Sequence, residues 1–251
     1  MKIRTYITGL RWVDHAGYDG WDGMAGCEGC AHDASNIHRI IEDEAARLNY
    51  GYPWDTVMRL DQHATHDESL SILSRLVTDS EPGDHINVYW SGHGMQIPDD
   101  DGDEDDGLDE ALCAFDKPIR DDQLYKILLL AKPGVTIFWV TDTCFAGGMP
   151  RFAFSWPWTR PSLKLNRPAM SASMIHIGAC REDQTAGGHP DGGEFTRALC
   201  AMWAEHGPMS YEDLHMRITE RFRTSSQKPT VMTYGPMPKR FLESTAFGGV
   251  R

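Results

Sequence analysis

The chain has 251 residues and an apolar content of 41%, which suffice for a folded core and exclude a disordered composition. Its longest apolar runs are much too short to span a bilayer, and a net charge of −13 argues against a nucleic-acid partner. Nine acidic residues fall between Asp99 and Glu110, without a Lys or Arg among them, so the remainder of the chain is nearly balanced in charge.

The N-terminus and the cysteines indicate the compartment. Met1 to Ile7 includes a basic residue but has no apolar core of signal-peptide length. Without a secretory signal, the six cysteines are expected to be free thiols. We therefore expect a cytoplasmic protein that binds neither nucleic acid nor a membrane.

Apolar periodicity predicts strands that alternate with helices for most of the chain. In chain order we expect a strand at 3–10, a helix at 31–48, a strand at 56–60, a helix at 68–77, a strand at 85–90, a helix at 121–131, strands at 135–140 and 174–178, helices at 193–205 and 211–223, and a strand at 229–234. Segments 11–29 and 151–168 have no clear period and are expected to be irregular. This order predicts a mostly parallel sheet with helices on both faces.

Two short polar segments follow predicted strands of this sheet. They are Ser91-Gly92-His93-Gly94 and Asp142-Thr143-Cys144-Phe145, and His93 precedes Cys144 by 51 positions. Catalytic groups in parallel sheets gather at the carboxyl ends of the strands, and a histidine about 50 residues before a cysteine is typical of caspase-type proteases.

The two side chains form a plausible catalytic pair. A cysteine thiol is only partly ionised at neutral pH, and a histidine can take its proton and later protonate the leaving amine. We predict His93 and Cys144 as the catalytic residues, with the backbone N–H groups of Gly94 and Cys144 as the oxyanion hole. No third side chain for a triad is evident, and a dyad suffices for this chemistry.

Several further segments follow the pattern of a known family. They are Cys30 to Asp33, Tyr89 to Gly94, Asp101 to Glu110, Asp142 to Gly147, Ala179 to Ala186 and Gly193 to Leu199. With them the chain resembles the metacaspases and orthocaspases, caspase-like cysteine peptidases of clan CD, family C14. The resemblance implies a caspase-hemoglobinase α/β fold with a six-stranded, mostly parallel sheet flanked by helices on both faces. It also implies a single domain at 1–251, with a p20-like part at 1–150, a linker at 151–169 and a p10-like part at 170–251.

The resemblance also implies cleavage after Arg or Lys instead of Asp. The pocket for the P1 side chain would be built from Cys30, Asp33, Ser91 and Asp142, and carboxylates in a restricted pocket pair well with a guanidinium or ammonium group. The family usually has His-Ser-Gly after the nucleophile, where this chain has Phe145-Ala146-Gly147. The surroundings of the thiol are thus more apolar than is usual in the family, and we expect a different substrate preference.

Calcium is the cofactor that the resemblance suggests. Many metacaspases are activated by calcium, and Asp109, Asp121 and Asp122 match positions that bind it in the family. A further acidic ligand downstream of the nucleophile is not matched, because Arg151 stands near that place. The alternative is a solvated acidic loop without a metal.

Three functions remain open. The first is an active endopeptidase, expected to be a monomer, that acts on protein or peptide substrates with a basic P1 residue. The second is a latent caspase-like effector in bacterial immunity, such as antiviral defence, or in cell death, activated when a small ligand or partner binds the Trp-rich segments 11–29 and 156–158. The third is an inactive binding scaffold, against which the intact His93 and Cys144 argue. The linker contains Arg151, Arg160, Lys164 and Arg167, where an enzyme specific for basic residues would cleave itself.

Overall fold

The computed structural model describes residues 1–23, 27–48, 54–98, 108–143, 154–155 (backbone only), 169–179 and 191–248. Strands and helices alternate in it largely as the periodicity predicts. The strands of the main sheet are β1 (Ile3–Gly9), β2 (Trp54–Leu60), β3 (His85–Ser91), β7 (Thr136–Asp142), β8 (Phe154–Ser155), β9 (Ser173–Gly178) and β10 (Thr230–Tyr234). The α-helices are α1 (Cys30–Leu48), α2 (His66–Thr78), α3 (Asp121–Leu128), α4 (Glu194–His206), α5 (Tyr211–Arg221) and α6 (Lys239–Leu242).

The main sheet has the strand order β2-β1-β3-β7-β9-β10-β8. The strands β2, β1, β3, β7 and β9 run parallel to one another. Strand β10 is antiparallel to both β9 and β8. The six longer strands confirm the expected six-stranded, mostly parallel sheet. The seventh, β8, lies in the segment that we predicted to be irregular, because a strand of two residues is too short to show any periodicity.

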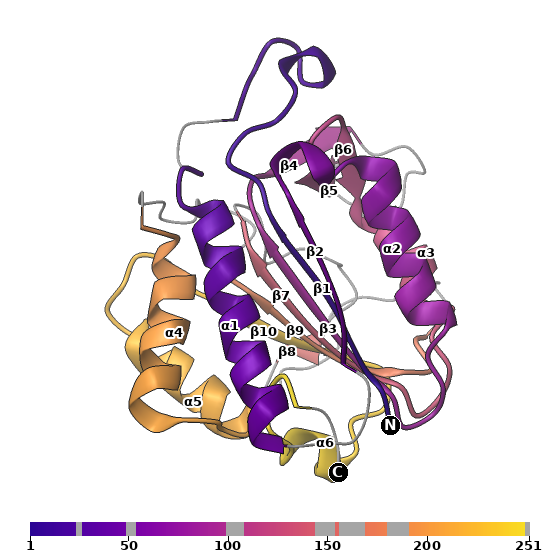
Figure 1. Cartoon of the computed structure of the whole chain (residues 1–251), viewed down its shortest axis with the longest axis vertical. Coiled ribbons are helices and arrows are strands. Elements are labelled where there is room, and N and C mark those ends of the chain that lie inside the picture. Colours follow the sequence, from indigo (N-terminus) through magenta and orange to yellow (C-terminus); the bar gives the residue numbers. More distant parts are fainter. Residues whose placement is uncertain are drawn as a thin grey trace.

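Helices cover both faces of this sheet, with α2 and α3 on one side and α1, α4 and α5 on the other (Figure 1). Successive residues of a strand point to opposite faces, and the core is divided accordingly. Trp139 packs with the side chains of α2 and α3, whereas its neighbour Phe138 packs with those of α1, α4 and α5. In α1, buried Ala34, Ile37 and Ile41 recur at helical spacing, which is why the sequence predicts this helix well.

A second, antiparallel sheet was not predicted from the sequence. It consists of β4 (Gly94–Pro98), β5 (Leu108–Cys113) and β6 (Pro118–Arg120). β4 is mostly half-buried, so apolar alternation does not mark it. The backbone N–H of Cys113 donates to the carbonyl of His93 at 2.9 Å, which fixes the chain where β3 passes into β4.

The register of the parallel strands places three residues side by side at their carboxyl ends. Gly9 of β1 pairs with Ser91 of β3, and Ser91 pairs with Asp142 of β7. A Cβ atom on Gly9 would lie 2.3 Å from the carbonyl oxygen of Cys30, so only glycine lets the start of α1 pack directly on this strand end. The sheet therefore brings α1 and two polar strand ends together.

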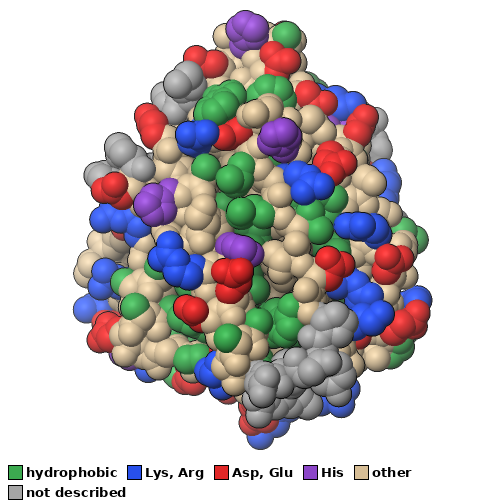
Figure 2. Space-filling model, viewed as in Figure 1, with side chains coloured by type: hydrophobic (Ala, Val, Ile, Leu, Met, Phe, Trp, Pro, Cys, Tyr) green, Lys and Arg blue, Asp and Glu red, His purple; other side chains and the backbone are tan. Residues whose placement is uncertain are grey.

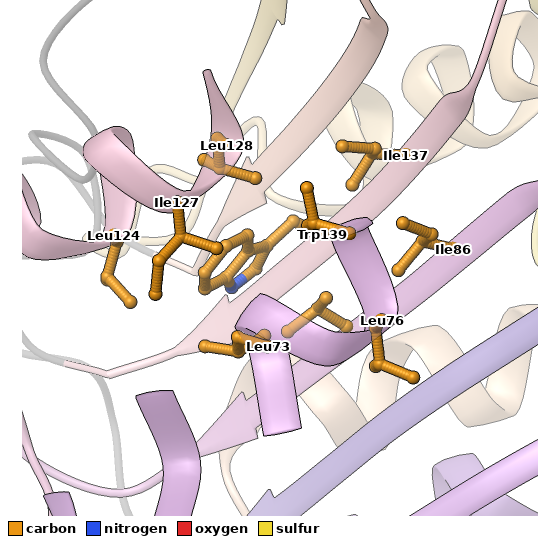
Figure 3. A pocket seen from close by; sticks show the side chains of 10 residues that line it. Leu73, Leu76, Ile86, Leu124, Ile127, Leu128, Ile137 and Trp139 are labelled. Carbon is orange, nitrogen blue, oxygen red and sulfur yellow. The ribbon is translucent and has the colours of Figure 1, made fainter. Parts of the chain in front are cut away.

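An enclosed apolar space lies between the sheet and the helices α2 and α3 (Figure 3). Its ten lining residues are all apolar, and they include Leu73, Leu124, Ile137 and Trp139. Since no charged or nucleophilic side chain lines it, this space belongs to the core and offers no chemistry.

The described surface agrees with the expected charge balance. Lys and Arg side chains are interspersed with Asp and Glu over the face seen in Figure 2. No helix among the described residues has the length and apolarity to cross a membrane.

Candidate active site

The structure brings the predicted pocket residues together at the strand ends. Asp33 lies in the first turn of α1, and Ser91 Oγ donates a hydrogen bond to its Oδ2 at 3.2 Å. Asp142 is paired with Ser91 across the sheet, and Cys30 is the first residue of α1. All four side chains are buried.

The start of α4 binds both carboxylates. The backbone N–H of Gly193 donates to Asp33 Oδ2 at 2.8 Å. Thr196 donates twice to Asp142 Oδ2, from its N–H at 3.1 Å and from its hydroxyl at 2.6 Å. Unpaired N–H groups at a helix N-terminus favour negative charge, so α4 stabilises two buried carboxylates that would otherwise repel each other.

Two glycines allow this approach of α4. A Cβ on Gly192 would lie 2.1 Å from Asp33 Oδ1, and one on Gly193 would lie 2.5 Å from Asp142 Oδ2. Gly192 also has φ +115°, a conformation that favours glycine. No larger residue would leave the helix terminus in contact with both carboxylates.

Among the described residues no ion pair reaches either carboxylate, and the charge of Arg197 lowers the pKa of Asp33 only against the larger effect of burial. Burial, reinforced by the charge of Asp142, raises the pKa of Asp33 to about 7. Burial likewise raises the pKa of Asp142 to about 6, against the hydrogen bonds from Thr196. Oδ1 of Asp33 is buried and has no hydrogen-bond partner among the described residues. Desolvation of a buried carboxylate costs folding free energy, and buried groups with a shifted pKa are candidates for a functional site.

This cost predicts a pH-dependent effect of Asp33→Asn on stability. Because the folded-state pKa of Asp33 lies above that of the unfolded chain, the folded state binds more protons between about pH 4 and pH 7. The contribution of Asp33 to the free energy of unfolding therefore falls as the pH rises through this window. We expect the Tm of Asp33→Asn, relative to wild type, to be higher at pH 8 than at pH 5 in thermal melts. A difference that is flat or falls with pH would contradict this assignment.

His93 is half-buried at the junction of β3 and β4, and its ring is held by the Gly- and Trp-rich loop. Its Nε2 lies 2.6 Å from the carbonyl oxygen of Gly23. A carbonyl can only accept a hydrogen bond, so Nε2 carries the proton and Nδ1 is the nitrogen that can act as a base. The edge of Trp21 contacts the same ring, with the ring centroids 4.7 Å apart.

The environment of His93 favours the neutral base. Burial lowers its pKa, against the opposing effects of the Gly23 carbonyl and the charge of Glu28. A neutral imidazole with a fixed tautomer and a restrained ring is suited to take a proton from a nucleophile. The contact with Gly23 was not predicted from the sequence, because a backbone carbonyl cannot be recognised from residue types.

Cys144 follows Thr143 directly in the chain but lies outside the described residues. Gly94 is the first residue of β4 and follows His93. The Cys-His pair and the oxyanion hole from Gly94 and Cys144 therefore stay predictions. The same holds for nearly all of the linker at 151–169, of which only 154–155 and 169 are described.

Two of the three predicted calcium residues, Asp109 and Asp122, form ion pairs with basic side chains, and Asp121 is buried at the start of α3. Asp109 forms an ion pair with Arg120, whose guanidinium also donates to the carbonyl of Pro98 at 2.7 Å. Asp122 pairs with Lys126 at 3.0 Å. Within the described ranges, no cluster of three or more His, Cys, Asp or Glu side chains could hold a metal ion. Asp99 to Gly107, the larger part of the acidic segment, lie outside the described residues, so calcium binding stays a prediction.

A family model described as "Metacaspase, peptidase C14 domain" matches residues 16–151, more than half of the chain. Metacaspase-1A of Aspergillus oryzae is 35% identical over 111 residues, which are 39% of this chain and 26% of that protein. Metacaspase-1A of Neurospora crassa is 34% identical over 113 residues, 40% of this chain and 25% of that protein. The match thus spans about a quarter of the length of these relatives.

Two solved structures resemble the whole architecture. Protein GSU0716 from Geobacter sulfurreducens has a TM-score of 0.80 at 24% identity, over the full length of both chains. Caspase-1 from Spodoptera frugiperda has a TM-score of 0.52 at 12% identity, over 92% of this chain and 85% of that one. At these identities the likeness concerns the fold, and it confirms the expected caspase-like architecture.

Proposed function

Because this chain belongs to the metacaspase family of C14 cysteine peptidases, we propose that it is an endopeptidase that cleaves proteins after Arg or Lys. The observation that carries the proposal is the pair of buried carboxylates at the carboxyl ends of the parallel strands, Asp33 in the first turn of α1 and Asp142 at the end of β7. A substrate guanidinium or ammonium group would pair with these carboxylates, for which the described residues supply the nearby charge of Arg197 but no ion pair.

In the proposed reaction, Nδ1 of His93 takes the thiol proton of Cys144, and the sulfur attacks the carbonyl carbon of the scissile bond. The backbone N–H groups of Gly94 and Cys144 would stabilise the negative charge on the carbonyl oxygen. His93 then returns the proton to the nitrogen of the leaving peptide as the C–N bond breaks. Water, deprotonated by His93, hydrolyses the thioester and releases the second product.

Peptides that differ only in P1 test the specificity. We expect the wild-type protein to cleave Arg-P1 and Lys-P1 peptides with kcat/KM at least about 100-fold above that for the matched Asp-P1 peptide, because an Asp side chain would face two carboxylates. The release of a fluorophore measures the three rates. A preference for Asp-P1 would refute the proposed specificity.

Metal dependence is a separate question, and no step of the proposed reaction runs through a metal. Calcium stays a prediction, to be tested by dialysis against a chelator and assay with and without added calcium. A full rate after chelation would show that activity does not require calcium. A rate that is lost on chelation and restored by calcium alone would establish the requirement.

The remaining expectations also stay predictions. They are a monomeric state, a cytoplasmic location, self-cleavage in the linker and a small-molecule activator. No specific observation among the described residues favours the latent effector or the inactive scaffold over the active peptidase. Intact mass after incubation, compared with Cys144→Ala, tests self-cleavage.

A further inference from the structure

The side chain of Thr196, in the first turn of α4, links two buried groups. Its hydroxyl lies 2.6 Å from Asp142 Oδ2 and 2.6 Å from the hydroxyl of Tyr89. All three residues are buried: Tyr89 is on β3, Asp142 ends β7 and Thr196 belongs to α4. The contact therefore joins three elements.

The direction of the hydrogen bonds in this chain follows from the chemistry of the groups. An ionised carboxylate can only accept, so the single hydroxyl proton of Thr196 goes to Asp142. Thr196 Oγ1 must then accept at its other side, and the Tyr89 hydroxyl is the donor. Burial raises the pKa of Tyr89 well above its ordinary value, which keeps this donor protonated.

Both hydrogen bonds that α4 gives Asp142 reach the same oxygen. The N–H and the hydroxyl of Thr196 both bind Oδ2, which leaves Oδ1 as the second acceptor of this carboxylate. A carboxylate fixed at one oxygen has a defined orientation, and a defined orientation is what a guanidinium needs for paired hydrogen bonds.

We propose that Thr196, held in place by the Tyr89 hydroxyl, is a positioning residue that orients Asp142 toward the P1 cation of the substrate. Through it, the first turn of α4 sets the preference for a charged P1 side chain. This inference rests on the proposed function, because it assigns a role within the same pocket.

The arrangement also predicts a change in the pH profile. The hydroxyl of Thr196 lowers the pKa of Asp142, against the larger effect of burial. Without this hydroxyl the pKa of Asp142 rises, and Asp142 is then protonated at a higher pH. The acidic limb of kcat/KM for a charged P1 substrate should therefore move to higher pH, which a general loss of stability would not cause.

The test compares Thr196→Val and Thr196→Ser on peptides with Arg or with citrulline, its uncharged isostere, at P1. For Thr196→Val we expect kcat/KM on the Arg peptide to fall about 10- to 100-fold, since a hydrogen bond to a charged group is lost, while the citrulline rate changes little. Thr196→Ser keeps the hydroxyl and should restore the Arg preference. Thr136→Val is the matched control, because Thr136 is a buried threonine at the opposite end of β7 that bonds His85 instead.

A carboxyl-carbon NMR titration of Asp142 tests the positioning role of Thr196 separately from the proposed peptidase activity. If the wild type does not cleave the Arg peptide, the proposed function fails, but a higher titration midpoint in Thr196→Val still supports the positioning role. An unchanged Arg-to-citrulline ratio and an unchanged midpoint in Thr196→Val would overturn the inference. The Tm of each variant shows that the folded protein is being compared.

Discussion

Replacing His93 by alanine is expected to lower kcat/KM for an Arg-P1 peptide by about 10²–10⁴-fold, the range for loss of a general acid and base. The expectation rests on two features of its environment. The Gly23 carbonyl fixes the proton on Nε2, and burial lowers the pKa, so that His93 is the neutral base that the reaction requires. The rate of fluorophore release from the peptide measures the loss.

The control for this variant is another histidine. His63→Ala removes an exposed imidazole near the edge strand β2 and should leave kcat/KM within about threefold of wild type. Cys144→Ala should abolish the remaining turnover. A His93→Ala protein that keeps the wild-type rate with an unchanged Tm would exclude His93 as the base.

Asp142→Ala is expected to lower kcat/KM for the Arg-P1 peptide by about 10²–10³-fold, because a buried partner of the substrate cation is lost. The same substitution relieves the cost of burying this charge, so the folded protein should not become less stable at pH 8 for electrostatic reasons. The assay is the same peptide hydrolysis, and a thermal melt of the variant accompanies it.

A neighbouring acid provides the matched control. Glu194 is the exposed first residue of α4, and its charge raises the pKa of Asp142. Glu194→Ala removes a negative charge from the same helix terminus without removing a pocket carboxylate, and should change kcat/KM less than about threefold. If Asp142→Ala still turns over the Arg peptide at the wild-type rate, the pocket assignment is wrong.

The main sheet and its helices could be predicted because strands buried on both faces read as continuous apolar runs, whereas helices buried on one side show an apolar stripe of period 3.6. In β7, seven buried residues in succession mark a strand covered on both faces, and α1 shows its apolar stripe clearly. The antiparallel sheet from β4 to β6 could not be predicted in this way. Its strands are short, and β4 is mostly half-buried, so pairing rather than periodicity defines it.

The candidate site could also be predicted only in part from the sequence. Asp33, Ser91 and Asp142 are side chains at predictable element ends, and the structure places them together. The contact of α4 with them depends on a helix that starts some 50 residues after Asp142 in the chain, which no local pattern locates. The contact between His93 and the Gly23 carbonyl could not be predicted for a different reason, because every residue has a backbone carbonyl.

The first turn of α4 also explains why the family motif at Gly193 to Leu199 begins with glycine. A side chain at Gly193 would collide with Asp142, and loss of the hydroxyl at Thr196 would remove a bond to the same carboxylate. One helix terminus from the later part of the chain thus binds both carboxylates of the predicted pocket.

Covalent labelling of Cys144 most directly tests the central claim, that Cys144 is the nucleophile of a site that prefers a basic P1 residue. It tests the nucleophile and the P1 preference in a single experiment. The wild-type protein would be treated with matched peptidyl acyloxymethyl ketones carrying Arg or Asp at P1, and analysed by intact mass and peptide mapping. We predict one adduct on Cys144 from the Arg reagent, little from the Asp reagent, and strongly reduced labelling in Asp142→Ala. Equal labelling by both reagents, or an Arg adduct on another cysteine, would contradict the account.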